Sequence, residues 1–195
     1  NINIFVLHPH NRISKIQRKL MTTVKENNVY NLAIEGNFDD CQKLVKSMFI
    51  DQSFNAEINM SGVNSINWAR IIPQIVYYFF GYFQINNSSQ KINFSVPTGN
   101  FGDVFAGYIA KKMGLPINKL IVATNKNNIL KRVIDTGIYK PKEVFQTISP
   151  SMDIQIASNF ERLIFYISSH DDQITLKKME ELKKNNEFKL NNEQM

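Results

Sequence analysis

The nine residues Ser-Val-Pro-Thr-Gly-Asn-Phe-Gly-Asp, at positions 95–103, constrain the fold of this chain more than any other stretch. The apolar residues 92–96 lead into them and break at Pro97, a pattern typical of a buried strand that ends in a turn. Beyond them, apolar side chains recur at helical spacing until Gly114 and Pro116 stop the pattern. The sequence therefore predicts a strand, a glycine-rich loop and a helix.

This loop has the features of an anion-binding site. The first amides of a helix have no intrahelical partner, and the helix dipole places positive potential there. Gly99 and Gly102 can adopt positive φ, so that several N–H groups converge on one phosphate. The Gly-x-x-Gly spacing is neither the dinucleotide fingerprint nor a Walker loop. Spacing alone is equally compatible with glycines that serve only a tight turn.

Strands and helices alternate along the first half of the chain, which predicts parallel βαβ units. Ser14 is expected to cap one helix, and Asn37 or Asp39 the next. The polar stretch 51–59 is expected to be an irregular crossing between subdomains. Strands are expected over residues 2–7, 29–34, 92–96 and 119–124.

A second polar cluster precedes a long apolar helix that runs through residues 71–80. Asn64, Ser65 and Asn67 stand where this helix should begin, so their side chains can act as caps. The same groups can bind a ligand, with Arg70 supplying a fixed charge for a phosphate or carboxylate. The residues alone leave both interpretations open.

Composition narrows the class of protein. The 195 residues are 43% hydrophobic, which is enough for an ordinary globular core, and the net charge of +6 comes from scattered Lys and Arg, which argues against nucleic-acid binding. The apolar run 71–83 is too short and interrupted for a membrane span. Cys41 is the only cysteine, and His8 and His10 have no third ligand at a recognised spacing, so no metal site is predicted.

Several blocks of the sequence resemble the threonine synthase family, whose members are fold-type II pyridoxal-phosphate enzymes. The resemblance covers nearly the whole chain, and the blocks that carry it occur in the family's order; they are residues 31–42, 63–70, 97–107, 148–155 and 158–162. The resemblance implies an α/β fold of parallel-sheet αβα lobes, similar to the tryptophan synthase β subunit. Residues 1–60 would belong to the smaller, mobile lobe, and residues 61–195 to the larger lobe that binds the cofactor phosphate.

The resemblance also implies an activity and its site. Pyridoxal 5'-phosphate would be held through its phosphate by Gly99, Asn100, Phe101 and Gly102. The substrate O-phospho-L-homoserine would react with water to give L-threonine and phosphate, the last step of threonine biosynthesis. The residues implied to hold the substrate phosphate are Asn64, Ser65 and Arg70, with Asn67 assisting.

One part of the family's pattern is missing. The family's Schiff-base lysine lies in a Phe-Lys-Asp context, and this sequence has no such triplet, so no catalytic residue is assigned. The chain begins at Asn1 with no signal-peptide pattern and is expected to be an internal, inactive piece of a cytoplasmic enzyme, monomeric or homodimeric. Two alternatives are a related pyridoxal-dependent phospho-lyase and a non-catalytic phosphate-binding module.

Overall fold

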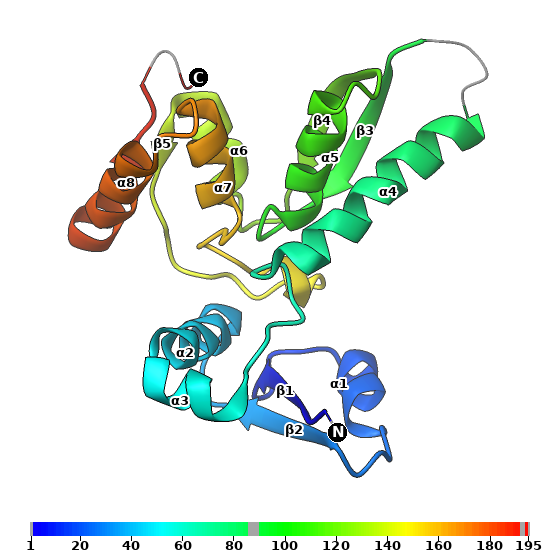
Figure 1. Ribbon diagram of the computed structural model, residues 1–195, viewed down its shortest axis with the longest axis vertical. Coiled ribbons are helices and arrows are strands. Elements are labelled where there is room, and N and C mark those ends of the chain that lie inside the picture. Colours follow the sequence, from blue (N-terminus) through cyan, green and yellow to red (C-terminus); the bar gives the residue numbers. More distant parts are fainter. Residues whose placement is uncertain (1, 86–89, 192–193, 195) are drawn as a thin grey trace.

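The computed structural model describes residues 2–85, 90–191 and 194. Its first part lies below the remainder of the chain in Figure 1 and contains two strands and three helices. These elements are β1 (Ile4–Pro9), α1 (Lys15–Thr22), β2 (Val29–Ile34), α2 (Phe38–Ile50) and α3 (Gln52–Ile58). β1 and β2 pair in parallel, with Ile4 opposite Val29 and Pro9 opposite Ile34, which confirms the predicted βαβ unit.

The helix starts in this part follow local side-chain chemistry. Ser14 caps α1 by accepting a hydrogen bond from the Gln17 amide at 3.1 Å. Asn37 caps α2, and the Asp40 carboxylate accepts from the Asn37 amide at 2.7 Å, which completes a capping box. The predicted caps at Ser14 and Asn37 are therefore confirmed.

The prediction for residues 51–59 was wrong, because α3 occupies most of this stretch. Asp51 ends α2 and also caps α3, accepting from the Phe54 amide at 3.1 Å, and Asn59 closes the helix in the left-handed conformation. The helix has two turns and no buried residue. Such a short polar helix has no apolar periodicity from which it could be recognised.

The second part carries the glycine-rich loop. β3 (Ile92–Pro97) and β4 (Ile117–Ala123) pair in parallel, and α5 (Gly102–Lys112) connects them. α4 (Trp68–Ile85) packs against α5. The remaining elements are α6 (Ile129–Thr136), β5 (Ile138–Tyr139), the 3₁₀ turn η1 (Pro150–Met152), α7 (Phe160–Ile167), α8 (Asp172–Asn185) and β6 (Phe188–Lys189), which pairs antiparallel with β5.

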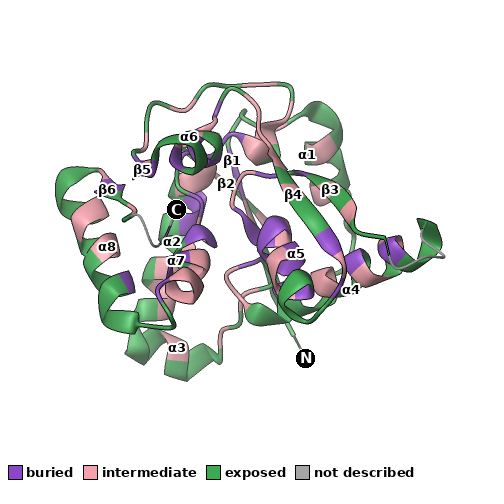
Figure 2. Ribbon diagram, turned by 90° about the horizontal axis from the view of Figure 1, so that it is seen from above, coloured by how far each residue is buried: buried purple, intermediate pink, exposed green. Residues whose placement is uncertain are grey.

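The core is centred on α5, whose residues are coloured mainly as buried in Figure 2. Phe105 is fully buried between the Trp68 ring of α4 and the Tyr166 ring of α7. A Cβ atom on Gly107 would lie 2.6 Å from the Tyr78 ring, so only glycine allows this approach of α4. The Tyr78 hydroxyl then donates to the Asp103 carbonyl at 2.8 Å, which fastens α4 to the first turn of α5.

The outer face of α4 is apolar and uncovered. Its exposed side chains follow a helical stripe, Ile72, Val76, Phe80 and Phe83, each 58–65% exposed. No helix in the described ranges is both long enough and apolar enough to cross a membrane.

The close approach at Gly107 predicts opposite effects for two identical substitutions. Gly107→Ala should destabilise the protein by about 1–3 kcal/mol, because the new methyl group overlaps the Tyr78 ring. Gly81→Ala in α4 should instead stabilise by about 0.5–1 kcal/mol, since its nearest neighbour is 3.7 Å away and alanine favours the helix. Urea unfolding of the protein expressed from the complete reading frame measures both, and equal effects would contradict the packing argument.

Candidate anion-binding site

The backbone of the glycine-rich loop differs from the expectation. Neither Gly99 nor Gly102 has the predicted positive φ; the left-handed residue is Phe101, with φ of 69°. The two glycines serve close approach instead. A Cβ atom on Gly99 would lie 3.1 Å from the Met152 Cα, and one on Gly102 would lie 3.0 Å from the Ser65 Cβ. The loop is therefore tight because two other segments press against it.

Phe101 is held in a conformation that a non-glycine residue rarely adopts. The left-handed region costs such a residue about 1–2 kcal/mol. The Phe101 ring is only 4% exposed and packs edge-on against Phe160 at 5.4 Å between ring centroids. Burial of this ring offsets the backbone strain and fixes the direction in which α5 begins.

The first turn of α5 presents backbone donors to the loop. Gly102 donates its N–H to the Asn100 Oδ1 at 3.2 Å, while the Asp103 and Val104 amides lie in the first turn, where a helix supplies no acceptor. Burial raises the pKa of Asp103, and the Tyr78 hydroxyl and the Arg70 charge counteract this rise. The dipole and free amides of this helix end suit an anionic ligand.

Ser65 joins the second polar cluster to the loop. Its Oγ accepts a hydrogen bond from the Asn100 Nδ2 at 2.8 Å and another from the Asn159 Nδ2 at 2.8 Å. The Ser65 residue is buried, with 8% of its surface exposed. The two predicted sets of ligand-binding residues thus meet at this hydroxyl.

The other predicted residues of the cluster have local partners or none. The Asn64 Oδ1 accepts from the Ile66 amide at 3.1 Å, and the Asn67 Oδ1 accepts from the Ala69 amide at 2.9 Å, as turn and cap residues do. Arg70 is exposed, and nothing in the described ranges forms a hydrogen bond or ion pair with its guanidinium. Its charge is therefore available to a ligand.

Two residues of the site were missed as functional candidates. Asn159 is 1% exposed, and its Oδ1 accepts from the Arg162 Nε at 3.1 Å. Arg162 also donates to the Ile66 carbonyl at 2.6 Å and lies over the Trp68 ring at 5.0 Å. Both lie in the block 158–162, which suggested the family but carried no spacing signal for a role.

A buried carboxylate holds the segment that presses on Gly99. The Asp153 Oδ1 accepts from the side-chain amides of Asn125, at 2.8 Å, and Asn127, at 3.0 Å, and from the Thr147 hydroxyl at 2.7 Å. These bonds hold the neighbouring Met152 in place beside the glycine.

Elsewhere His10 pairs with Glu35 at 2.6 Å. The described residues contain no cluster of three or more His, Cys, Asp or Glu suited to a metal.

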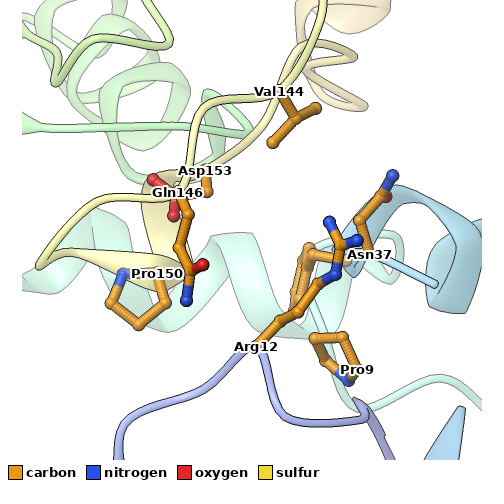
Figure 3. Close-up of a pocket in the computed structure, with 8 residues that line it drawn as sticks. Pro9, Arg12, Asn37, Val144, Gln146, Pro150 and Asp153 are labelled. Atoms are coloured by element: carbon orange, nitrogen blue, oxygen red, sulfur yellow. The ribbon is translucent and has the colours of Figure 1, made fainter. Parts of the chain in front are cut away.

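A small pocket lies between residues of the first part of the chain and residues of the second part (Figure 3). Arg12 and Asn37 face Gln146 and Asp153 across it. The pocket is lined by Pro9, Arg12, Asn37, Phe38, Val144, Gln146, Pro150 and Asp153.

Among the described residues, two hydrogen bonds connect the two parts near this pocket. Gln17 donates from its side chain to the Ser151 hydroxyl at 3.2 Å, and the Gln155 amide donates to the Asp39 Oδ2 at 3.4 Å. The Asp39 Oδ1 is buried and has no partner among the described residues. Burial raises the pKa of this carboxyl to about 6.

Comparison with known proteins identifies relatives that share one name. No family model matches the chain. It is 55% identical over 165 residues to a threonine synthase of Pseudomonas aeruginosa, covering 85% of this chain and 35% of that protein. It is 48% identical to a threonine synthase of Saccharomyces cerevisiae, covering 97% of this chain and 39% of the relative. The chain thus spans little more than a third of the length of these curated relatives.

A solved structure supports the same relationship. The crystal structure of a threonine synthase from Brucella melitensis with bound PLP superposes with a TM-score of 0.85 at 52% sequence identity. The match covers 98% of this chain and 41% of that one. The fold is therefore the α/β, fold-type II architecture that the resemblance implied.

The partly buried Asp39 predicts a pH dependence of stability. Its folded-state pKa of about 6 lies above the ordinary value of 3.8, so its contribution to stability is full below pH 3.8 and is lost as the pH rises through 6. Asp39→Asn keeps an acceptor for Gln155 and removes the charge. At pH 7 it should stabilise the protein by about 1–2 kcal/mol, less than two pKa units imply because the N-terminus of α2 favours the anion.

The matched control is the neighbouring carboxylate. Asp40→Asn weakens the capping box at Asn37 and should destabilise by about 0.5–2 kcal/mol. Urea unfolding at pH 4 and pH 7 separates the two effects. A gain from Asp39→Asn that is as large at pH 4 as at pH 7 would contradict the assignment to this carboxyl.

Proposed function

Because this chain is homologous to a segment of the threonine synthases, we propose that the protein converts O-phospho-L-homoserine and water into L-threonine and phosphate with pyridoxal 5'-phosphate. The observation that carries the proposal is the contact of Ser65 with Asn100. This contact places the residues assigned to the substrate phosphate beside those assigned to the cofactor phosphate. One site can then hold both the phosphate of the cofactor and the phosphate of the substrate.

The loop before α5 fits the phosphate of the cofactor. A Cβ atom on Gly99 or Gly102 would lie only 3.0–3.1 Å from its nearest neighbours, so the backbone there is closely packed, and the left-handed Phe101 turns the chain into the helix. The first-turn amides and the helix dipole then bind a dianion without a charged side chain. The cofactor, when bound, supplies the electron sink of the reaction.

The substrate phosphate is assigned to the turn before α4. Arg70, in the first turn of α4, supplies an exposed guanidinium with no hydrogen-bond or ion-pair partner among the described residues, and the Ser65 hydroxyl and the Asn64 side-chain amide supply neutral polar groups. Negative charge accumulates on the leaving phosphate as its bond to carbon breaks. A fixed cation and a hydrogen-bond donor stabilise that charge. Asn67 supports the turn through its bond to the Gly62 carbonyl at 2.9 Å.

The proposal extends to the organisation of the enzyme. We assign residues 1–60 to the smaller lobe and 61–195 to the larger one, which contains both phosphate-binding segments. The pocket between the two parts and the few hydrogen bonds across it are compatible with lobe movement. The enzyme would act in the cytoplasm as a monomer or homodimer.

The reaction also requires a lysine in a Phe-Lys-Asp context, which these 195 residues do not contain. We therefore expect the 195-residue chain alone to be inactive. A non-catalytic phosphate-binding module is the alternative that this absence favours. The test uses the protein expressed from the complete reading frame that encodes the chain.

The first experiment combines a spectrum with product analysis. An absorbance band of lysine-bound pyridoxal phosphate that disappears on borohydride treatment, together with threonine and phosphate formed from O-phospho-L-homoserine, is the expected result. An oxo-acid in place of threonine would identify a related phospho-lyase. A protein that gains no such band with added pyridoxal phosphate would overturn the enzyme assignment and leave the binding module.

Arg70 provides a quantitative test of the substrate assignment. Arg70→Ala should raise KM for O-phospho-L-homoserine by on the order of tenfold to a hundredfold, since a hydrogen bond to a charged group is lost. The cofactor band should not change, because Arg70 is not assigned to the cofactor. The control, Arg18→Ala on the exposed face of α1, should leave KM unchanged. An equal rise in both variants would mean that net charge, and not Arg70, determines substrate affinity.

A further inference from the structure

Both acceptor positions of the Ser65 hydroxyl are filled from within the protein. A serine hydroxyl carries two lone pairs and one proton. The Asn100 and Asn159 side-chain amides each donate to the Ser65 Oγ at 2.8 Å. No described residue accepts the hydroxyl proton of Ser65 in return. The proton is therefore confined to the one direction that the two amides leave open.

The orientation of each amide is itself fixed. The Asn100 Oδ1 accepts from the Gly102 N–H, so its Nδ2 must face Ser65. The Asn159 Oδ1 accepts from the Arg162 Nε, which can only donate, so its Nδ2 must face Ser65 as well. Rotating either amide by 180° would bring two donors or two acceptors together. The Gly102 N–H and the Arg162 Nε, which orient the two amides, therefore leave the Ser65 hydroxyl only a donor role.

Asn159 also holds the loop. Its second Nδ2 proton is donated to the Asn100 carbonyl at 3.2 Å, and its backbone N–H is donated to the same oxygen at 3.0 Å. At 1% exposure Asn159 cannot act directly on a bound substrate. Every polar atom of its side chain has a partner within the site, and its effect must pass through Ser65 and Asn100.

We propose that Asn159, oriented by Arg162, is a positioning residue that makes the Ser65 hydroxyl an obligate hydrogen-bond donor to the phosphate of the substrate. The proposal rests on the function proposed above and adds a reason for phosphate selectivity. A phosphate dianion offers only acceptors, so it matches a hydroxyl that can only donate. A ligand that presents a donor at this position would find no acceptor on Ser65.

A double-mutant cycle with Ser65 tests this role. In Asn159→Asp a carboxylate oxygen replaces Nδ2, so the Ser65 proton turns toward residue 159 and is lost to the ligand. In the cofactor-saturated protein from the complete reading frame, the dissociation constant of inorganic phosphate, measured by calorimetry, should rise on the order of tenfold to a hundredfold. KM for O-phospho-L-homoserine should rise in parallel. Ser65→Ala should raise both constants by a similar factor. The double variant should bind phosphate no more weakly than the weaker-binding of the two single variants.

The control is Asn128→Asp, the same change beside an arginine elsewhere in the fold. The Asn128 Oδ1 accepts from the Arg132 Nε at 3.2 Å, as Asn159 does from Arg162, but Asn128 lies outside the site. It should leave phosphate affinity unchanged. The proposal would be overturned if the rise in the phosphate dissociation constant in the double variant equalled the product of the rises in Ser65→Ala and Asn159→Asp. Unchanged phosphate affinity in Asn159→Asp would overturn it as well.

Arg162 gives a second route if Asn159→Asp does not fold. Arg162→Met frees the Asn159 amide to rotate and should weaken phosphate binding, whereas Arg162→Lys keeps a donor and should restore part of it. Equal losses in both would overturn the positioning role. Phosphate affinity is measured without turnover, so a wild-type protein that binds phosphate in this pattern yet forms no threonine would refute the proposed function and not the role of Asn159.

Discussion

The site depends on the absence of two Cβ atoms. Gly99 in the loop lies against Met152, the last residue of η1, and Gly102, the first residue of α5, lies against Ser65, so this region touches both η1 and the turn before α4. Gly107, one turn further on, lets α4 reach α5 in the same way. Three segments that are distant in sequence are brought together because the loop before α5 and α5 itself carry no side chain at these points of contact.

The fold was largely predictable from local patterns, and the contacts of the site were not. Apolar periodicity and cap residues such as Ser14 and Asn37 located the strands of the two parallel sheets and most helices, but not the two-residue strands β5 and β6. The short helix α3 was missed because it has too few apolar residues to show a period. The positive φ was assigned to the glycines because glycine adopts it freely, whereas tertiary packing of the Phe101 ring places it on phenylalanine.

The site combines a rigid network with one unpaired cation. The Asn159 side chain makes all its hydrogen bonds within the protein, and the Ser65 hydroxyl accepts two bonds while its proton has no acceptor among the described residues. Arg70, an exposed residue in the first turn of α4, has no side-chain partner in the described ranges. Sequence reasoning proposed Arg70 and Ser65 because a guanidinium and a hydroxyl carry recognisable chemistry. It missed Asn159, whose bonding is fully satisfied and whose importance lies only in its geometry.

The two parallel sheets have a consequence for handling this chain in isolation. Within the described ranges each has only two strands, β1 with β2 and β3 with β4, so each has open edges with unpaired backbone groups. Phe5 and Tyr30 stack on the first sheet while 60% and 45% exposed. An open strand edge beside exposed aromatic rings is a template for strand addition between copies. The isolated segment should therefore self-associate at the concentrations used for purification.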